Sequence, residues 1–143
     1  MVRDPFLDGL VGSWDLQSQM GETRLHQAVT ARWVLGGRYV QLSFRELDGS
    51  PYEALYHLGR DEATGLYVLH LLDSTGVYPE PSHVVGRGSR EGDSIPFVFA
   101  DAEEPFTNRL GWDAAAQAWE WELTYVEKGE VRTFATKRMV SSI

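Results

Sequence analysis

The chain has 143 residues, no cysteine and a formal net charge of −8 at pH 7. This length suits one domain spanning residues 1–143, and the lack of cysteine excludes disulfides, thiol nucleophiles and cysteine metal ligands. The acidic charge argues against binding to nucleic acid or to an anionic membrane surface, because both need a basic footprint. The first residues show no secretory signal pattern, and no apolar run reaches the roughly 18 residues of a membrane span. The sequence therefore predicts a cytoplasmic protein.

Residues 4–11 are predicted to form a short helix. Asp4 suits the N-cap position, and Pro5 suits the first helical position. The apolar residues of this segment would share one face: Phe6, Leu7, Leu10 and Val11. Such a helix would plug one end of a barrel.

After residue 11, strand patterns alternate with turn residues to the end of the chain. The turns recur about every 12 residues, which is typical of a meander of hairpins. We expect strands near residues 12–20, 24–35, 38–46, 52–60, 66–72, 82–90, 94–101, 105–112, 117–126 and 130–138. Sequential hairpins favour an antiparallel up-and-down sheet, and ten strands favour closure because closure removes exposed edges. The predicted fold is therefore all-β, a barrel of about ten strands with a short N-terminal helix.

The turn at Gly36-Gly37 predicts which side chains face the interior. Directly paired residues share a face of the sheet. This turn pairs Trp33 with Val40 and Val29 with Phe44. The pairs are apolar, so we expect them to point inward.

The next loop decides which face His57 occupies. Two common lengths for the loop around Asp48-Gly49 place Leu55 and His57 inward beside Phe44, whereas an odd bulge would reverse the faces. With His57 inside, the alternate residues would form an apolar stripe outside, which predicts a homodimer interface. This stripe comprises Tyr52, Ala54, Tyr56, Leu58, Tyr67, Leu69 and Leu71. The dimer and an interior histidine site are therefore linked predictions.

The turn at residues 61–65 leaves two registers open. One places His70 directly opposite His57, with both inside, and the other places Leu69 there and turns His70 outward. With both histidines inside, Glu53 would complete a partial metal site or orient a histidine that acts as acid–base catalyst. The spacing matches no metal motif, so the sequence predicts no metal and no cofactor. A hydrogen-bonded pair of half-buried histidines is the simpler interpretation.

The last hairpin predicts further ligand-binding residues. A two-residue turn at Lys128-Gly129 gives a mostly aromatic face that should point inward. Its expected pairs are Tyr125 with Arg132, Leu123 with Phe134, Trp121 with Thr136 and Trp119 with Arg138. Trp121 and Tyr125 would line the interior. Arg132 would bind the carboxylate or phosphate of a ligand, unless it is an exposed arginine paired with a neighbouring glutamate.

Several short motifs resemble a known superfamily. Gly12-Ser13-Trp14 resembles the first-strand signature of lipocalins and their calycin relatives. Residues 34–39, 59–61, 64–67 and 73–74 resemble the turns of a bacterial lipocalin-like family that has no settled activity. The resemblance covers about the first half of the chain and implies a barrel of eight to ten strands with an apolar cavity. Because a lipocalin arginine near the last strand packs on the signature tryptophan, it also implies a structural Trp14–Arg138 contact.

The leading functional prediction is binding of a small apolar or amphiphilic molecule in the barrel cavity. The alternative is an enzyme that uses the cavity with His57 or His70 as acid–base. Further alternatives are a haem or metal carrier and a filled barrel that acts as a dimerisation module. Nitrobindin-like haem barrels, which are distant relatives of lipocalins, hold haem through a histidine near the C-terminus. All four histidines here precede residue 84, which weakens the haem alternative.

Overall fold

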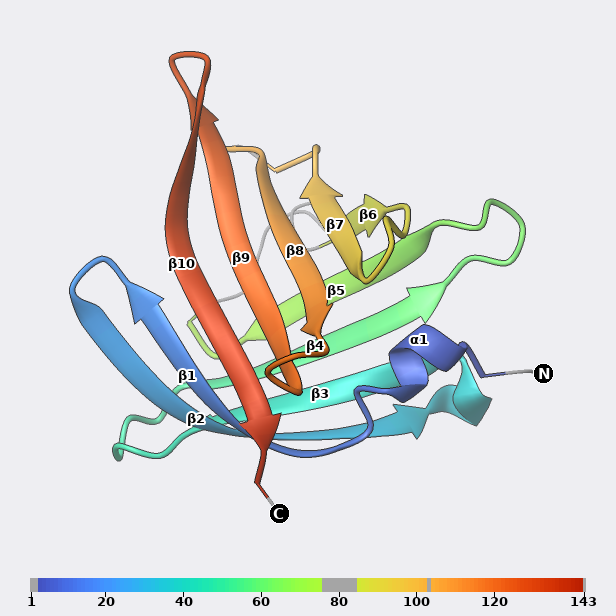
Figure 1. The fold of residues 1–143 in the computed structure, drawn as a ribbon, viewed down its shortest axis with the longest axis horizontal. Helices are drawn as coiled ribbons and strands as arrows, with labels where there is room; N and C mark the ends of the chain where they lie inside the picture. The colour runs from blue at the N-terminus through green and yellow to red at the C-terminus, as the bar shows by residue number, and fades with distance from the viewer. Residues whose placement is uncertain (1–2, 76–84, 103, 143) are drawn as a thin grey trace.

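The computed structural model describes residues 3–75, 85–102 and 104–142, whose strands close into a barrel (Figure 1). The described elements are α1 (Pro5–Asp8), β1 (Gly12–Met20), β2 (Thr23–Val34), the 3₁₀ turn η1 (Leu35–Gly37), β3 (Tyr39–Glu46), β4 (Glu53–Arg60), β5 (Tyr67–Asp73), β6 (Val85–Gly88), β7 (Ser94–Phe99), β8 (Phe106–Asp113), β9 (Ala118–Glu127) and β10 (Glu130–Ser141). Neighbouring strands pair antiparallel in chain order, and β1 closes the ring by pairing with β10. The predicted antiparallel up-and-down barrel with a short N-terminal helix is therefore confirmed. No described helix is long and apolar enough to cross a membrane.

The helix α1 plugs one end of the barrel, on the right in Figure 1. The Asp4 carboxylate accepts hydrogen bonds of 3.0 Å from the backbone N–H groups of Phe6 and Leu7, which is the predicted N-cap. Phe6, Leu7 and Leu10 are buried, whereas Val11 is exposed. The helix ends at Asp8, three residues earlier than predicted.

Two buried tryptophans hold this plug to the barrel wall. The Trp14 indole N–H donates to the carbonyl of Leu10 at 2.7 Å, and the Trp119 indole N–H donates to the carbonyl of Gly9 at 3.2 Å. Both rings are buried. Because each bond satisfies both a buried indole and a backbone carbonyl at the end of the helix, the plug is fixed in position.

The turn between β2 and β3 has the predicted register. Trp33 pairs with Val40 and Val29 pairs with Phe44. Gly36 and Gly37 adopt φ values of 71° and 84°, a conformation that glycine reaches without steric cost. Val29, Val40 and Phe44 are buried, so the inward face is confirmed.

The predicted inward orientation of Leu55 and His57 is wrong. Arg45 pairs with Glu53, so the connection comprises residues 46–52, an odd number that exchanges the two faces of β4. The apolar stripe predicted to lie outside instead lines the interior, where its members Ala54, Tyr56, Leu58, Tyr67 and Leu69 are buried. The sequence argument for a dimer interface on this stripe therefore no longer holds.

A β-bulge in β10 changes the register of the last hairpin. Tyr125 pairs with Arg132 as predicted, but the register shifts between Thr133 and Ala135 and leaves Phe134 outside the pairing. The predicted pairs beyond this point are wrong: Leu123 pairs with Ala135, Trp121 with Lys137 and Trp119 with Met139. The bulge therefore turns Lys137 and Met139 inward.

The same shift places Arg138 on the outer face. Its guanidinium bonds to the Glu120 carboxylate and lies 3.8 Å from the Asp113 carboxylate. Met139, fully buried, takes the inward position that was predicted for the arginine. The expected packing of Arg138 on Trp14 is therefore wrong, although Trp14 is buried as expected.

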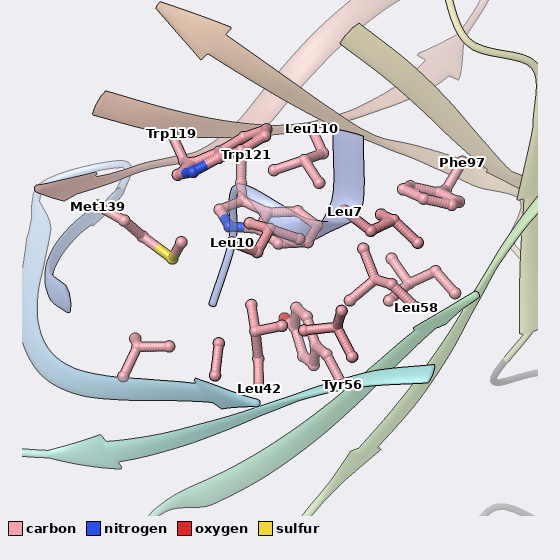
Figure 2. Close-up of a cluster of buried hydrophobic side chains, with 14 of the residues drawn as sticks. Leu7, Leu10, Leu42, Tyr56, Leu58, Phe97, Leu110, Trp119, Trp121 and Met139 are labelled. Carbon is pink, nitrogen blue, oxygen red and sulfur yellow. The ribbon is translucent and has the colours of Figure 1, made fainter. Parts of the chain in front are cut away.

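Apolar side chains fill the interior next to the plug (Figure 2). Side chains from opposite walls meet there, and the largest that are fully buried are Trp121, Phe97, Phe99, Leu7, Leu10, Leu16, Leu42, Leu58, Leu69, Ile95, Leu110 and Met139. The burial of these apolar side chains stabilises the α1 end of the barrel. The part of the interior away from α1 has a different composition.

Candidate functional site

Polar side chains gather on the inner face of the barrel, away from α1. Among the described residues, four polar side chains are at least nine-tenths buried: Ser18, Gln27, Glu46 and Asn108. Buried polar atoms normally have hydrogen-bond partners. In the described part of the chain, partners are missing for Ser18 Oγ, Gln27 Oε1, Glu46 Oε2, both side-chain polar atoms of Asn108, and Trp121 Nε1. We call Ser18, Gln27, Glu46, Tyr56, Trp121 and Lys137 the inner polar cluster.

Three members of this cluster bridge the barrel from wall to wall. Lys137 Nζ on β10 donates to the Tyr56 hydroxyl on β4 at 3.2 Å. The Tyr56 ring meets the Trp121 ring of β9 edge to face, with 5.4 Å between centroids. Tyr56 and Trp121 face each other across the interior in Figure 2. The bridge therefore joins β9 and β10 to β4 across the interior.

The Lys137 ammonium is half-buried among aromatic rings. It lies 5.6 Å from the Tyr56 ring centroid and 5.9 Å from that of Phe44. Both distances allow cation–π attraction. An ammonium group has three donors and one is used by Tyr56, so Lys137 can bind an acceptor on a ligand.

Gln27 and Glu46 form a second polar pair on β2 and β3. They are direct cross-strand neighbours, and Gln27 Nε2 donates to Glu46 Oε1 at 2.7 Å. The remaining oxygens, Gln27 Oε1 and Glu46 Oε2, can accept from a ligand. The acceptor oxygens of the cluster therefore lie on β2 and β3, and its donor groups, the Trp121 indole and the Lys137 ammonium, lie on β9 and β10.

Ser18 lies between these two groups. It pairs with Lys137 of β10 on one side and with Leu25 of β2 on the other. The pairing of β1 with β10 ends at Gln19 and Thr136. Beside this end lies a depression of about 500 Å³, which Ser18, Trp121 and Lys137 line together with mostly outward-facing residues of β1, β2, β9 and β10. The cluster therefore adjoins a hollow in the barrel wall.

The predicted ligand-binding residues of the last hairpin are only partly brought together. Trp121 belongs to the inner polar cluster and is 1% exposed. Tyr125 is half-buried nearer the hairpin tip. Arg132 is exposed, with Nη2 2.9 Å from Glu130 Oε2, which matches the alternative of an ion-paired arginine at a strand end.

The predicted histidine site lies on the outer face of the barrel. His57 and His70 are directly opposite each other, as one of the two registers predicted. His57 Nε2 is 3.1 Å from Gln41 Oε1, and the exposed Glu53 shares this outer face. The pair is half-buried, as in the simpler interpretation, but the hydrogen bond joins His57 to Gln41 and not to His70. Glu53, His57 and His70 do not join the inner polar cluster.

Both imidazoles are expected to titrate below the ordinary histidine range. Burial lowers the pKa of His57. Burial, then the charges of His57 and Arg87, lower the pKa of His70. Burial dominates in both cases because it disfavours the charged form.

Acidification should therefore destabilise the protein through this pair. The unfolded chain takes up protons near pH 6.5 and the folded chain only at lower pH, so this contribution to stability is complete above 6.5 and is lost as the pH falls through the folded pKa values. NMR titration of the ring protons should give midpoints below 6.5 for His57 and His70. Urea unfolding between pH 7.5 and 5 should depend less on pH in the double variant His57→Gln, His70→Gln. An equal slope in both proteins would contradict the assignment.

Part of the inner polar cluster was predictable by extending the alternation of the strands. Gln27 lies two residues before the inward Val29, and Glu46 lies two residues after the inward Phe44, so both share the inner face. The same register pairs Gln27 with Glu46. The inward position of Lys137 could not be predicted, because no turn residue in the sequence marks the bulge at Phe134. The missing hydrogen-bond partners have no sequence signal at all, because they depend on side chains from distant strands.

Comparisons with known proteins place the chain by fold. No family model matches it, and no curated protein sequence matches it. The solved structure of Rv2717c from M. tuberculosis is similar, with a TM-score of 0.54, 17% sequence identity, and coverage of 99% of this chain and 100% of that chain. At this identity the likeness shows the barrel fold, over essentially the full length of both chains.

Proposed function

We propose that the protein binds a small amphiphilic molecule inside the barrel, at the inner polar cluster. The supporting observation is the set of buried polar atoms without partners at Ser18, Gln27, Glu46 and Trp121. An unpaired buried polar group costs about 1–3 kcal/mol. A ligand with complementary atoms removes this cost, so part of the binding energy comes from these polar atoms.

In this proposal, each part of such a ligand has a partner in the cluster. Its acceptor group binds to Lys137 Nζ, and a donor group binds to Glu46 Oε2. Its apolar part packs on Phe44 and Leu123, which are buried inner-face residues on either side of the cluster. Sites of this kind, mostly apolar with a few placed polar groups, are typical of small-molecule binding.

The described histidines do not favour the enzymatic or haem alternatives. His26, His57 and His70 all lie on the outer face of their strands, opposite to the buried residues that alternate with them. A barrel filled throughout by side chains and water is the competing outcome. It differs from the proposal in predicting no bound molecule.

Native mass spectrometry of protein purified without added ligand is the first test. The expected result is a reproducible additional mass that is lost on unfolding. A purified protein with only its own mass and no affinity for amphiphilic probes would contradict the proposal.

The Lys137→Met variant tests the site with a defined probe, 1-anilinonaphthalene-8-sulfonate, followed by fluorescence titration. Loss of a charged donor is worth about 1.5–3 kcal/mol, so its Kd should rise at least about 10-fold. Arg138→Met is the matched control, because it removes the same charge one residue away on the outer face. Its Kd should stay within about two-fold of the unchanged protein. Equal effects of the two substitutions would place the probe outside the barrel.

A further inference from the structure

Asn108 is the least satisfied polar side chain in the described interior. It is 0% exposed, and neither its amide oxygen nor its amide nitrogen has a partner. Its cross-strand neighbours are Phe97 on β7 and Leu123 on β9, and both are buried. Neither neighbour has a side-chain polar atom, so the amide has unused capacity for two donors and an acceptor.

The Trp121 indole is an inner-face donor at a position diagonal to Asn108. Asn108 pairs with Leu123, and Trp121 stands two residues before Leu123 on the same face of β9. Diagonal positions of this kind lie about 7–8 Å apart, which is the span of one small polar group and its hydrogen bonds. The Trp121 N–H also lacks a partner. The two side chains therefore offer donors and an acceptor at neighbouring inner-face positions of β8 and β9.

The direct neighbours of Asn108 along β8 and on β7 and β9 carry no charge. Along β8 its inner-face neighbours are Phe106 and Leu110, and Phe106 stacks on Phe99 with 4.4 Å between ring centroids and 8° between ring planes. An ion would lose its hydration here without a counter-ion, which is unfavourable. The flat aromatic wall favours a flat partner. An uncharged planar group fits this position and a carboxylate does not.

We propose that Asn108 determines ligand specificity by pairing with an uncharged carboxamide or lactam edge, which offers an acceptor and a donor side by side. This inference rests on the proposed function and adds a second recognition point to it. Lys137 holds one polar group of the ligand, and Asn108 with Trp121 holds the amide. The ligand class is thus an amphiphile that contains an amide on a flat apolar frame.

Three probes of one shape test the proposal: benzamide, benzoate and toluene. Their binding is followed by ¹H–¹⁵N NMR, in which the Asn108 side-chain amide and the Trp121 indole give separate signals. Benzamide should shift both signals, whereas benzoate, which can bind at Lys137, should leave the Asn108 signal unshifted. In Asn108→Leu, which has a similar shape, benzamide affinity should fall at least 10-fold while toluene affinity is kept.

The outcomes separate this inference from the proposed function. If benzamide binds equally well to Asn108→Leu, the specificity role is overturned while ligand binding stands. If the Asn108 signal shows exchange with a bound water and no shift with benzamide, water satisfies the amide and the role is again overturned. If none of the three probes nor 1-anilinonaphthalene-8-sulfonate binds to the unchanged protein, both proposals fail. Folding is checked by thermal unfolding, where Asn108→Leu should match or exceed the unchanged protein because it removes an unpaired polar group.

Discussion

Replacing Trp121 by alanine is expected to lower the free energy of unfolding by about 3–5 kcal/mol. The indole is 1% exposed and meets Tyr56 from the opposite wall at 5.4 Å. Its removal leaves a cavity at the point where the two sides of the barrel touch, and the strand backbones cannot move in to fill it. Guanidinium denaturation followed by far-UV circular dichroism measures the change.

Trp121→Phe is the matched control. Phenylalanine keeps most of the ring, so we expect a loss of roughly 1.5 kcal/mol or less. No hydrogen bond within the described structure is lost, because the indole N–H has no partner there. If the alanine variant lost no more stability than the phenylalanine variant, the interior would not be packed around this ring.

Gly88→Ala is expected to destabilise the barrel by about 3 kcal/mol or more, since overpacking costs typically 1–3 kcal/mol and the obstacle here is backbone. A Cβ atom at Gly88 would lie 1.9 Å from the carbonyl oxygen of Pro96. The pairing of β6 with β7 is also weak, because Arg87 and Val98 form the one described pair between these two strands. The strand must therefore separate from β7. Hydrogen exchange should show faster exchange of the β6 amides.

Gly111→Ala serves as the control for this substitution. The nearest atom to its added Cβ would be Ser94 Cβ at 3.5 Å, an ordinary contact. Thermal unfolding should therefore show a much smaller loss for Gly111→Ala than for Gly88→Ala. Equal losses would mean that the clash at Pro96 is relieved by a small shift of the strand.

The sequence predicted those parts of the fold that depend on local chemistry. The Asp4 cap and the Gly36-Gly37 turn are fixed by residues next to each other, and both were found as expected. The faces of β4 and of the end of β10 depend instead on a single residue: one more or fewer in the connection 46–52, and one extra at the Phe134 bulge. Because side chains alternate with a period of two, one residue exchanges the inner and outer faces of everything that follows. For this reason the sequence predicted His57 and Arg138 inside the barrel, whereas both lie on its outer face.

The candidate site was predictable to a smaller extent. Trp121 was expected inside because it lies on the aromatic face of β9. Lys137 and Tyr56 are 81 residues apart in the chain. No pattern within either strand predicts that they are in contact. Asn108 lies two residues from Phe106 on an alternating strand, so its face could be read from the sequence. Its lack of partners follows only from the three-dimensional packing around it.

The order of the strands has a consequence for how the protein folds. Each strand pairs with its neighbours in the chain, apart from the junction of β1 with β10, which joins Trp14 to Ser141. The other hairpins can form early and independently, whereas this junction must close a loop of almost the whole chain. Closure of β1 on β10 is therefore the slow step that we expect to limit the folding rate. Shortening the chain at its C-terminal end would remove this junction, and the loss would be cooperative rather than confined to the end.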